Sequence, residues 1–243
     1  MAIIQTEAIV LKTFDFRETS KIANFFSLEE GKVSGVLKGI RKDPRKFGSS
    51  LEPFSVNHIV YYRYSNSDLH LISQCDMRSF FLPIRQDLNR ALAAHYMAEL
   101  INRMMPSEMK NQKIYHLMLE FLNTLEVTDD IDRLIRLFQI KALLFSGFRP
   151  HLDACVSCKK KVAGKARFSM KEGGLVCPHC KVHDQTHPIS PGTVATILHA
   201  EQAPWSDAQR LRLTKTVRDE LKYILNNFLV FHLGKKIRSE RYV

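Results

Sequence analysis

The first eighty residues alternate apolar and polar positions with a period of two, which predicts β-strands. Five such runs lie at about residues 3–14, 20–26, 32–38, 54–64 and 68–75, and glycine, proline and Asn-Ser-Asp sequences separate them. In the fourth run both faces carry bulky side chains, as expected for a strand that is covered on both sides. Five short strands at this spacing predict a small barrel of OB type, although an SH3-like barrel fits the same pattern.

From about residue 84 the apolar period lengthens to about 3.6 residues, which predicts amphipathic helices. The first apolar stripe consists of Leu88, Leu92, Tyr96, Leu100 and Met104, and two further stripes follow over 114–125 and 131–145. Three aspartates, Asp129, Asp130 and Asp132, stand where the third helix begins, and there they would compensate the helix dipole. A metal-binding nuclease centre is the alternative for these aspartates.

Further helices are predicted after residue 188. Ser190 with Pro191 and Ser206 with Gln209 indicate two helix starts, and Gly234 indicates the end of a long last helix. The expected fold is therefore multidomain α+β. A five-stranded OB-type barrel domain covers residues 1–80, and a helical domain covers residues 81–243.

Four of the five cysteines form two Cys-x-x-Cys pairs, Cys155 with Cys158 and Cys177 with Cys180, with eighteen residues between the pairs. This spacing predicts a four-cysteine zinc site, carried by a hairpin inserted at about residues 151–187. Four thiolates fill a tetrahedral Zn²⁺ ion, so we expect the ion to be structural. Two disulfides or a redox switch are the alternatives. The nearby His179, His183 and His187 are expected to be bystanders, and Cys75 a small buried hydrophobe.

The chain carries 36 Lys and Arg against 25 Asp and Glu, a formal net charge of +11. The excess gathers around residues 31–50, over the cysteine hairpin, and in the last helix with the C-terminal tail. Such an excess suits a polyanionic partner, above all nucleic acid. The basic segment at residues 31–50 is predicted to be an exposed loop. Its basic residues are Lys32, Lys38, Arg41, Lys42, Arg45 and Lys46, and the only acidic residue in the segment is Asp43.

The chemistry expected at this loop is contact with nucleic-acid phosphates by Arg41, Lys42, Arg45 and Lys46. Tyr61, Tyr62 and Tyr64 are a second candidate, as a platform for base stacking, but alternate strand residues must point inward and a core position fits them better. The basic residues of the cysteine hairpin would either touch nucleic acid or belong to a scaffold.

Motifs of nucleotide-driven or hydrolytic enzymes are missing from the sequence. There is no GxxxxGK[ST], HExxH, GxSxG or GxGxxG, so no enzyme activity is expected. No apolar run approaches the about 18 residues of a membrane helix, and the N-terminus does not read as a signal peptide. A cytoplasmic protein without membrane contact is therefore expected.

Several stretches, by their order and spacing along the chain, resemble the bacterial RecO family of recombination mediators over essentially its whole length. They are FRETSKIANFFSLEEGKVSGVLKGIRK (16–42), LEPF (51–54), SGFRPHLDACVSC (146–158), FSMKEGGLVCPHC (168–180) and the ending HLGKKIRSERYV. The resemblance implies an OB domain, a helical domain with an inserted zinc hairpin, and no enzyme. It places the DNA-binding region of the barrel at Lys38, Arg41 and Lys42, with Arg45 and Lys46 extending it.

The resemblance also implies a function in DNA repair and recombination. Family members bind single- and double-stranded DNA without sequence preference and anneal complementary strands coated by single-strand DNA-binding protein (SSB). They act with RecR to help load the RecA recombinase, at the bacterial nucleoid during repair. The SSB tail docks on the helical domain in the family. The alternative from a different class is a zinc-ribbon adaptor that binds RNA or protein and has no annealing activity.

Overall fold

A computed structural model describes residues 2–43, 47, 51–162, 164–181 and 186–242. The chain divides into two compact units, Met1–Asp129 with Arg241–Val243, and Asp130–Glu240. A domain boundary at about residue 80 stays a prediction from the sequence.

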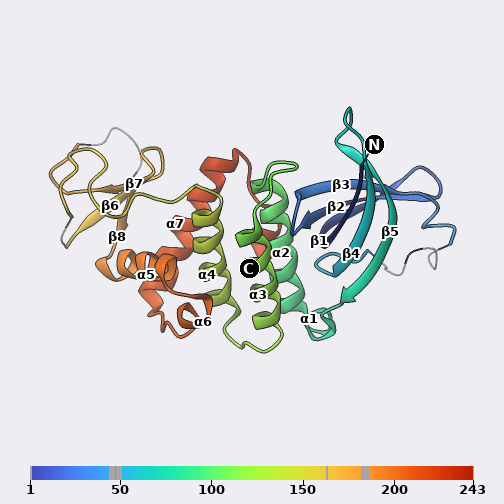
Figure 1. Cartoon of the computed structure of the whole chain (residues 1–243). Coiled ribbons are helices and arrows are strands. Elements are labelled where there is room, and N and C mark those ends of the chain that lie inside the picture. Colours follow the sequence, from blue (N-terminus) through green and yellow to red (C-terminus); the bar gives the residue numbers. More distant parts are fainter. Residues whose placement is uncertain (1, 44–46, 48–50, 163, 182–185, 243) are drawn as a thin grey trace. The chain divides into compact units, whose positions relative to one another are not determined.

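The first unit contains a closed five-stranded barrel (Figure 1). Its strands are β1 (Ala2–Phe16), β2 (Ser20–Ser27), β3 (Gly31–Leu37), β4 (Val56–Arg63) and β5 (Leu69–Ser79). The order around the barrel is β1-β2-β3-β5-β4, and β3 and β5 run parallel whereas the other pairs are antiparallel. The long β1 pairs with β4 through its first half and with β2 through its second half. This arrangement confirms the expected OB-type barrel.

The barrel interior holds the inward positions of the alternating pattern. Its core includes Phe25, Val33, Leu37 and Tyr61, each at most 1% exposed. Cys75 lies in the same cluster and is 0% exposed, which confirms that it is a small buried hydrophobe.

Three helices complete the first unit: α1 (Leu82–Gln86), α2 (Leu88–Met104) and α3 (Gln112–Leu125). Asp87 separates the first two, and its side chain accepts a hydrogen bond from the backbone N–H of Arg90 at 2.9 Å. The predicted stripe on α2 is wrong at Leu88, which is 73% exposed. The buried surface of α2 is a wide arc that includes Ala93, Ala94, Met97 and Ile101, because this helix packs against both β1 and α3.

The second unit contains α4 (Ile131–Phe145), α5 (Pro191–Gln202), α6 (Trp205–Ala208) and α7 (Lys215–Leu233). Its small sheet has the order β7-β6-β8, with β6 (Ala166–Ser169), β7 (Gly174–Val176) and β8 (Thr186–Ile189). Phe168 of β6 packs edge-on against Phe228 of α7, with ring centroids 5.7 Å apart, so the sheet is anchored on that helix. A 3₁₀ helix, Arg238–Tyr242, follows α7. None of the helices described is long and apolar enough to cross a bilayer.

The helix boundaries in this unit confirm two of the three predicted signals. The Ser190 hydroxyl accepts a hydrogen bond from the Thr193 N–H at 3.3 Å, and Gly234 ends α7 with a φ of 66°. The start predicted at Ser206 is wrong, because that residue lies within α6 after the cap position Pro204. The next long helix is capped instead by Thr214.

Polar side chains occupy part of the core of the second unit. Arg136 is 0% exposed, and its guanidinium donates to the side-chain oxygens of Gln139 at 2.8 Å and Asn226 at 3.1 Å. Lys141 is 5% exposed, and its ammonium donates to the carbonyls of Glu201 at 3.1 Å and Ala203 at 2.5 Å, at the end of α5. The cations on α4 therefore join α7 and α5 through satisfied hydrogen bonds.

Candidate metal centre and nucleic-acid surface

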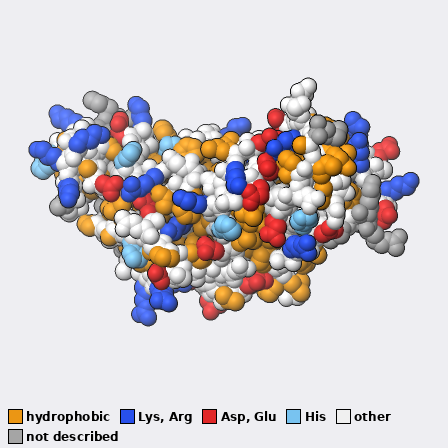
Figure 2. Space-filling model, viewed as in Figure 1, with side chains coloured by type: hydrophobic (Ala, Val, Ile, Leu, Met, Phe, Trp, Pro, Cys, Tyr) orange, Lys and Arg blue, Asp and Glu red, His pale blue; other side chains and the backbone are white. Residues whose placement is uncertain are grey.

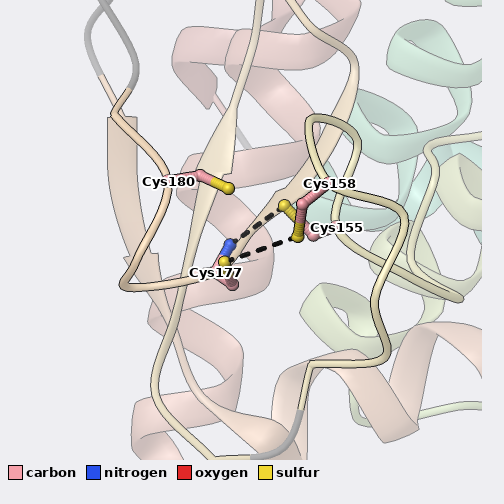
Figure 3. Close-up of side chains that lie close together, drawn as sticks. All are labelled: Cys155, Cys158, Cys177 and Cys180. Atoms are coloured by element: carbon pink, nitrogen blue, oxygen red, sulfur yellow. Dashed lines mark hydrogen bonds between the residues drawn. The ribbon is translucent and has the colours of Figure 1, made fainter.

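The four cysteines of the predicted zinc site lie together. Cys155 and Cys158 lie in the turn before β6, and Cys177 and Cys180 lie in the turn that follows β7. Their ligand atoms are all within 4.8 Å of one another and point toward a common centre (Figure 3). Sulfurs around one tetrahedral zinc ion at about 2.3 Å are about 3.8 Å apart. Because the Cys158 and Cys177 sulfurs are 3.9 Å apart, the cluster fits one such ion.

The backbone holds the two turns at this spacing. The Val156 N–H donates to a carbonyl of β7 at 2.8 Å, which ties the first turn to that strand. Gly174 permits the approach, because a Cβ at this position would lie 2.3 Å from the carbonyl oxygen of His151. The Cys177 N–H donates to the Cys155 sulfur at 3.4 Å and joins the two turns directly.

The electrostatics of the cluster favour a cation at its centre. Burial raises the pKa of Cys155, but the backbone N–H groups of Cys158 and Cys177 outweigh burial and bring this pKa to about 6. Hydrogen bonds with the Cys177 and Cys158 thiols raise the pKa of Cys180 to about 12. The pKa values of these two thiols are therefore driven apart, and a divalent ion supplies the charge that a set of four thiolates needs.

The neighbouring residues do not compete for this role. All five cysteines are free thiols, and 3.9 Å between the Cys158 and Cys177 sulfurs is far longer than a disulfide bond of about 2.05 Å. Within the described residues, the potential metal cluster contains only the four cysteines. His179 lies outside it, and the His187 ring stacks on Tyr223 with centroids 3.8 Å apart. His183 lies outside the described residues.

Three of the five predicted DNA-binding residues are exposed in the turn that follows β3. These are Lys38, Arg41 and Lys42. The turn is anchored by Ile40, which is only 5% exposed in the barrel core, so the basic side chains point outward. Arg45 and Lys46 lie outside the described residues.

The basic turn is attached to the turn between β1 and β2. The Arg41 N–H donates to the Thr19 carbonyl at 2.9 Å, and its guanidinium donates to the Arg17 carbonyl at 3.0 Å. The same guanidinium lies 3.5 Å from an Asp15 carboxylate oxygen, in an exposed ion pair. Arg17 is itself exposed and joins the same cationic surface. The pairing of β1 with β2 would have indicated Arg17, since their turn and the end of β3 lie on adjacent strands.

Lys32 belongs to the basic run in the sequence but not to this surface. Its ammonium donates to the backbone carbonyl of Asn102 in α2 at 3.0 Å, and burial lowers the pKa of Lys32. The Asn24 amide also donates to the Asn102 side-chain oxygen at 3.2 Å. Lys32 therefore helps to hold α2 on the barrel, as Figure 1 shows for the helix as a whole.

The tyrosines of β4 do not form a common stacking platform. Tyr61 is 0% exposed in the barrel core and stacks on His70, with ring centroids 5.3 Å apart. Burial raises the pKa of Tyr61 to about 12. Tyr62 and Tyr64 are half-buried. The core position expected for these residues is thus confirmed for Tyr61.

The acidic residues at the start of α4 are held by arginines. The Asp130 side chain caps the helix by accepting from the Arg133 N–H at 3.1 Å, and its carboxylate pairs with Arg218 at 2.5 Å. Asp132 pairs with Arg136 at 3.2 Å and with Arg218 at 3.4 Å. These contacts give Asp130 and Asp132 a structural role at the helix start.

The charge coupling between Asp130 and Arg218 is expected to stabilise the fold by about 1 kcal/mol at neutral pH. Hydrogen bonding to Arg218 holds the pKa of Asp130 below its ordinary value of 3.8. The stabilisation is therefore fully present well above pH 3.8 and is lost as the pH falls through the lowered pKa. A double-mutant cycle with Asp130→Asn and Arg218→Ala, followed by urea unfolding at about pH 7 and about pH 2.5, measures the coupling.

The exposed pair Asp207–Arg210, with N and O atoms 4.0 Å apart, is the matched control. Its coupling is expected to be close to zero at both pH values. A coupling between Asp130 and Arg218 that does not decrease in acid would contradict the assignment.

The cysteine hairpin carries a second group of exposed basic residues. They are Lys159, Lys160, Lys161, Lys165, Lys171 and Lys181. Figure 2 shows Lys and Arg side chains gathered over the small sheet of this unit. Arg167 is engaged within the hairpin, because its guanidinium donates to the Cys180 carbonyl at 2.8 Å.

An OB-type barrel with an exposed basic turn, followed by helices and a four-cysteine hairpin, defines a multidomain α+β protein of the OB-barrel class. The family models for the RecO N-terminal and C-terminal regions, described as "Recombination protein O", match residues 1–81 and 85–241. The chain therefore belongs to the RecO family, whose function is DNA repair and recombination.

Curated relatives agree over nearly the full length. The DNA repair protein RecO of Syntrophus aciditrophicus is 30% identical over 240 residues, which are 97% of this chain and 93% of the relative. The DNA repair protein RecO of Moorella thermoacetica is 28% identical over 244 residues, covering 99% of this chain and 90% of the relative. That of Desulfatibacillum aliphaticivorans is 30% identical over 247 residues, covering 99% and 96%.

Proposed function

We propose that this protein binds single- and double-stranded DNA without sequence preference, anneals complementary strands, and helps to load a recombinase onto SSB-coated DNA. The observation that carries the proposal is the exposed cationic turn of Lys38, Arg41 and Lys42, fixed on an OB-type barrel in a member of a recombination family. Arg45 and Lys46 would extend this surface along the chain.

Annealing requires that two strands approach each other while their base edges stay free. Lysine and arginine side chains that neutralise phosphates meet this requirement, because phosphate contacts carry no sequence information. A turn that is anchored by its backbone and exposes its side chains is suited to such contacts. No catalytic step is needed, so we propose that the protein is not an enzyme.

Cys155, Cys158, Cys177 and Cys180 would hold one Zn²⁺ ion. Four thiolates leave no position for a reactive water, so the bound ion would supply folding energy and no chemistry. We propose that it braces the hairpin in the second unit. Whether the lysines of this hairpin also touch DNA is a separate hypothesis.

The proposed partners follow from the family. They are DNA, RecR, SSB and, as the recombinase that is loaded, RecA. The proposed location is the bacterial cytoplasm, at the nucleoid during repair. A barrel domain over residues 1–80 would carry the main DNA contacts, and a helical domain over residues 81–243 would carry protein contacts.

Strand annealing by the purified full chain tests the proposed function. Two complementary oligonucleotides, one with a fluorophore and one with a quencher, are mixed with and without SSB. Addition of the protein is expected to accelerate quenching in both cases, whereas heat-denatured protein leaves the spontaneous rate. If the protein does not accelerate DNA annealing but binds RNA or another protein, the result would favour the zinc-ribbon adaptor and would overturn the mediator function.

A further inference from the structure

One face of the barrel beside the basic turn is exposed and carries aromatic rings. Ala23 and Phe25 of β2 point into the core, so Ile22 and its cross-strand partners point outward. These partners are Phe14 on β1 and Val36 on β3. The three side chains form one apolar row across three strands, in which Ile22 is only 8% exposed, Val36 is half-buried, and Phe14, at the edge, is 44% exposed.

Helix α2 covers the neighbouring part of the same face. Asn24, two residues beyond Ile22 on β2, bonds to Asn102 of α2 at 3.2 Å. Phe14 is the direct cross-strand partner of Ile22, and this pair lies closer to the β1–β2 turn than the pair of Lys12 with Asn24. Phe14 is thus the exposed edge of a face that is packed elsewhere.

Cations accompany the rings along β1. The alternation of the strand places Lys12, Phe14 and Phe16 on one face. The Lys12 ammonium lies 5.8 Å from the centroid of the Phe14 ring, and the Arg17 guanidinium lies 5.1 Å from the centroid of the Phe16 ring. Such pairs keep positive charge beside an exposed π-face.

The same face continues into the basic turn. Lys38 follows directly after β3, and Arg41 is bonded to the carbonyl of Arg17 in the β1–β2 turn. The acidic groups close by are Asp15, paired with Arg41 at 3.5 Å, and the exposed Glu18 and Asp43. The surface therefore combines aromatic rings with a local excess of positive charge.

We propose that Phe14 is a base-stacking position that makes this surface prefer single-stranded over double-stranded polynucleotide. The inference rests on the proposed DNA binding and adds a specificity-determining residue to it. Unpaired bases stack on the Phe14 ring while Lys12 and Lys38 neutralise the adjacent phosphates. Bases within a duplex are stacked on each other and are not available to the ring, so a duplex gains only the cationic contacts.

Charge decides between a polynucleotide and an apolar protein surface as the occupant. An apolar partner would leave the cations around Phe14 desolvated without counter-charges, which is costly. A single strand offers a π-face and a phosphate at every nucleotide and thus satisfies both components of the surface.

The test is Phe14→Ala in the full chain, with Phe14→Tyr as the conservative variant. The matched control is Phe231→Ala, which removes an aromatic side chain that is 50% exposed in the other unit. Fluorescence anisotropy measures binding to a dT oligonucleotide and to a duplex of the same length. Phe14→Ala is expected to weaken binding to the single strand about tenfold and to the duplex less than about twofold. Phe14→Tyr and the control are expected to keep wild-type affinities.

A second readout uses an oligonucleotide that contains 5-iododeoxyuridine, which is expected to crosslink under ultraviolet light to the peptide that contains Phe14. Equal effects of Phe14→Ala on both DNA forms, or no effect, would overturn the stacking position even if the wild type binds DNA. Failure of the wild type to bind either form would overturn the proposed function itself. The two failures are therefore distinguishable.

Discussion

Replacement of Cys177 by serine is expected to remove bound zinc and to unfold the cysteine hairpin. The apolar cluster of this hairpin is small and is built from the metal-binding residues themselves, since Cys155, Val176 and Cys177 are its buried members. A cluster of this size does not hold a fold alone. Structural zinc contributes about 10 kcal/mol or more of folding free energy in isolated fingers, so the loss of one ligand removes the main stabilising interaction.

Zinc content per chain and limited proteolysis measure this effect. Wild-type protein is expected to contain one zinc ion, and Cys177→Ser none, with new cleavage sites between residues 151 and 189. The matched control is Cys75→Ala, because Cys75 lies in the barrel core and outside the cluster. It is expected to keep its zinc, although it loses core packing. A full complement of zinc in Cys177→Ser would exclude this ligand set.

The triple substitution of Lys38, Arg41 and Lys42 by alanine is expected to weaken binding to single-stranded DNA about 100-fold at about 0.1 M salt. Each phosphate contact on a single strand contributes about −0.7 to the slope of log affinity against log salt. Three lost contacts should therefore make the slope less steep by about 2. Anisotropy titrations over a range of salt concentrations give both the affinity and the slope.

The control changes the net charge equally on the other unit. Arg210, Arg212 and Lys215 are exposed there, and their replacement by alanine is expected to change the slope by much less than the barrel variant does. Equal reductions for the two triple variants would indicate a general effect of net charge. An unchanged slope for the barrel variant would remove the basic turn from the interface.

The cysteine cluster was predictable because its geometry is largely local. Two residues between cysteines bring two sulfurs to one side of a turn, and a hairpin returns the second pair. The sequence does not reveal how this return is secured. That depends on the close approach of Gly174 to the carbonyl of His151 and on the bond from Val156 to β7, which are contacts between separate segments.

The basic region was predictable as a composition but not as a surface. Lys32, Lys38 and Arg41 belong to the same basic run in the sequence. In the structure Lys32 holds α2 on the barrel, whereas Lys38 and Arg41 are exposed. Phe14 was expected as part of a strand, and only the structure shows that its ring is 44% exposed. The buried position of Arg136 on α4 was likewise not predictable from the sequence, because its partner Asn226 lies on a helix far along the chain.

By itself, the sequence determined the five alternating strands, the presence of the long helices, the four-cysteine set and the excess of positive charge. These follow from periodicity, spacing and residue type, which act over a few neighbouring residues. The tertiary structure alone decided which cations and rings face solvent, and which serve as packing contacts. Burial is a property of pairs of elements that meet across long sequence separations, and the amphipathic pattern of one strand or helix does not specify its partner.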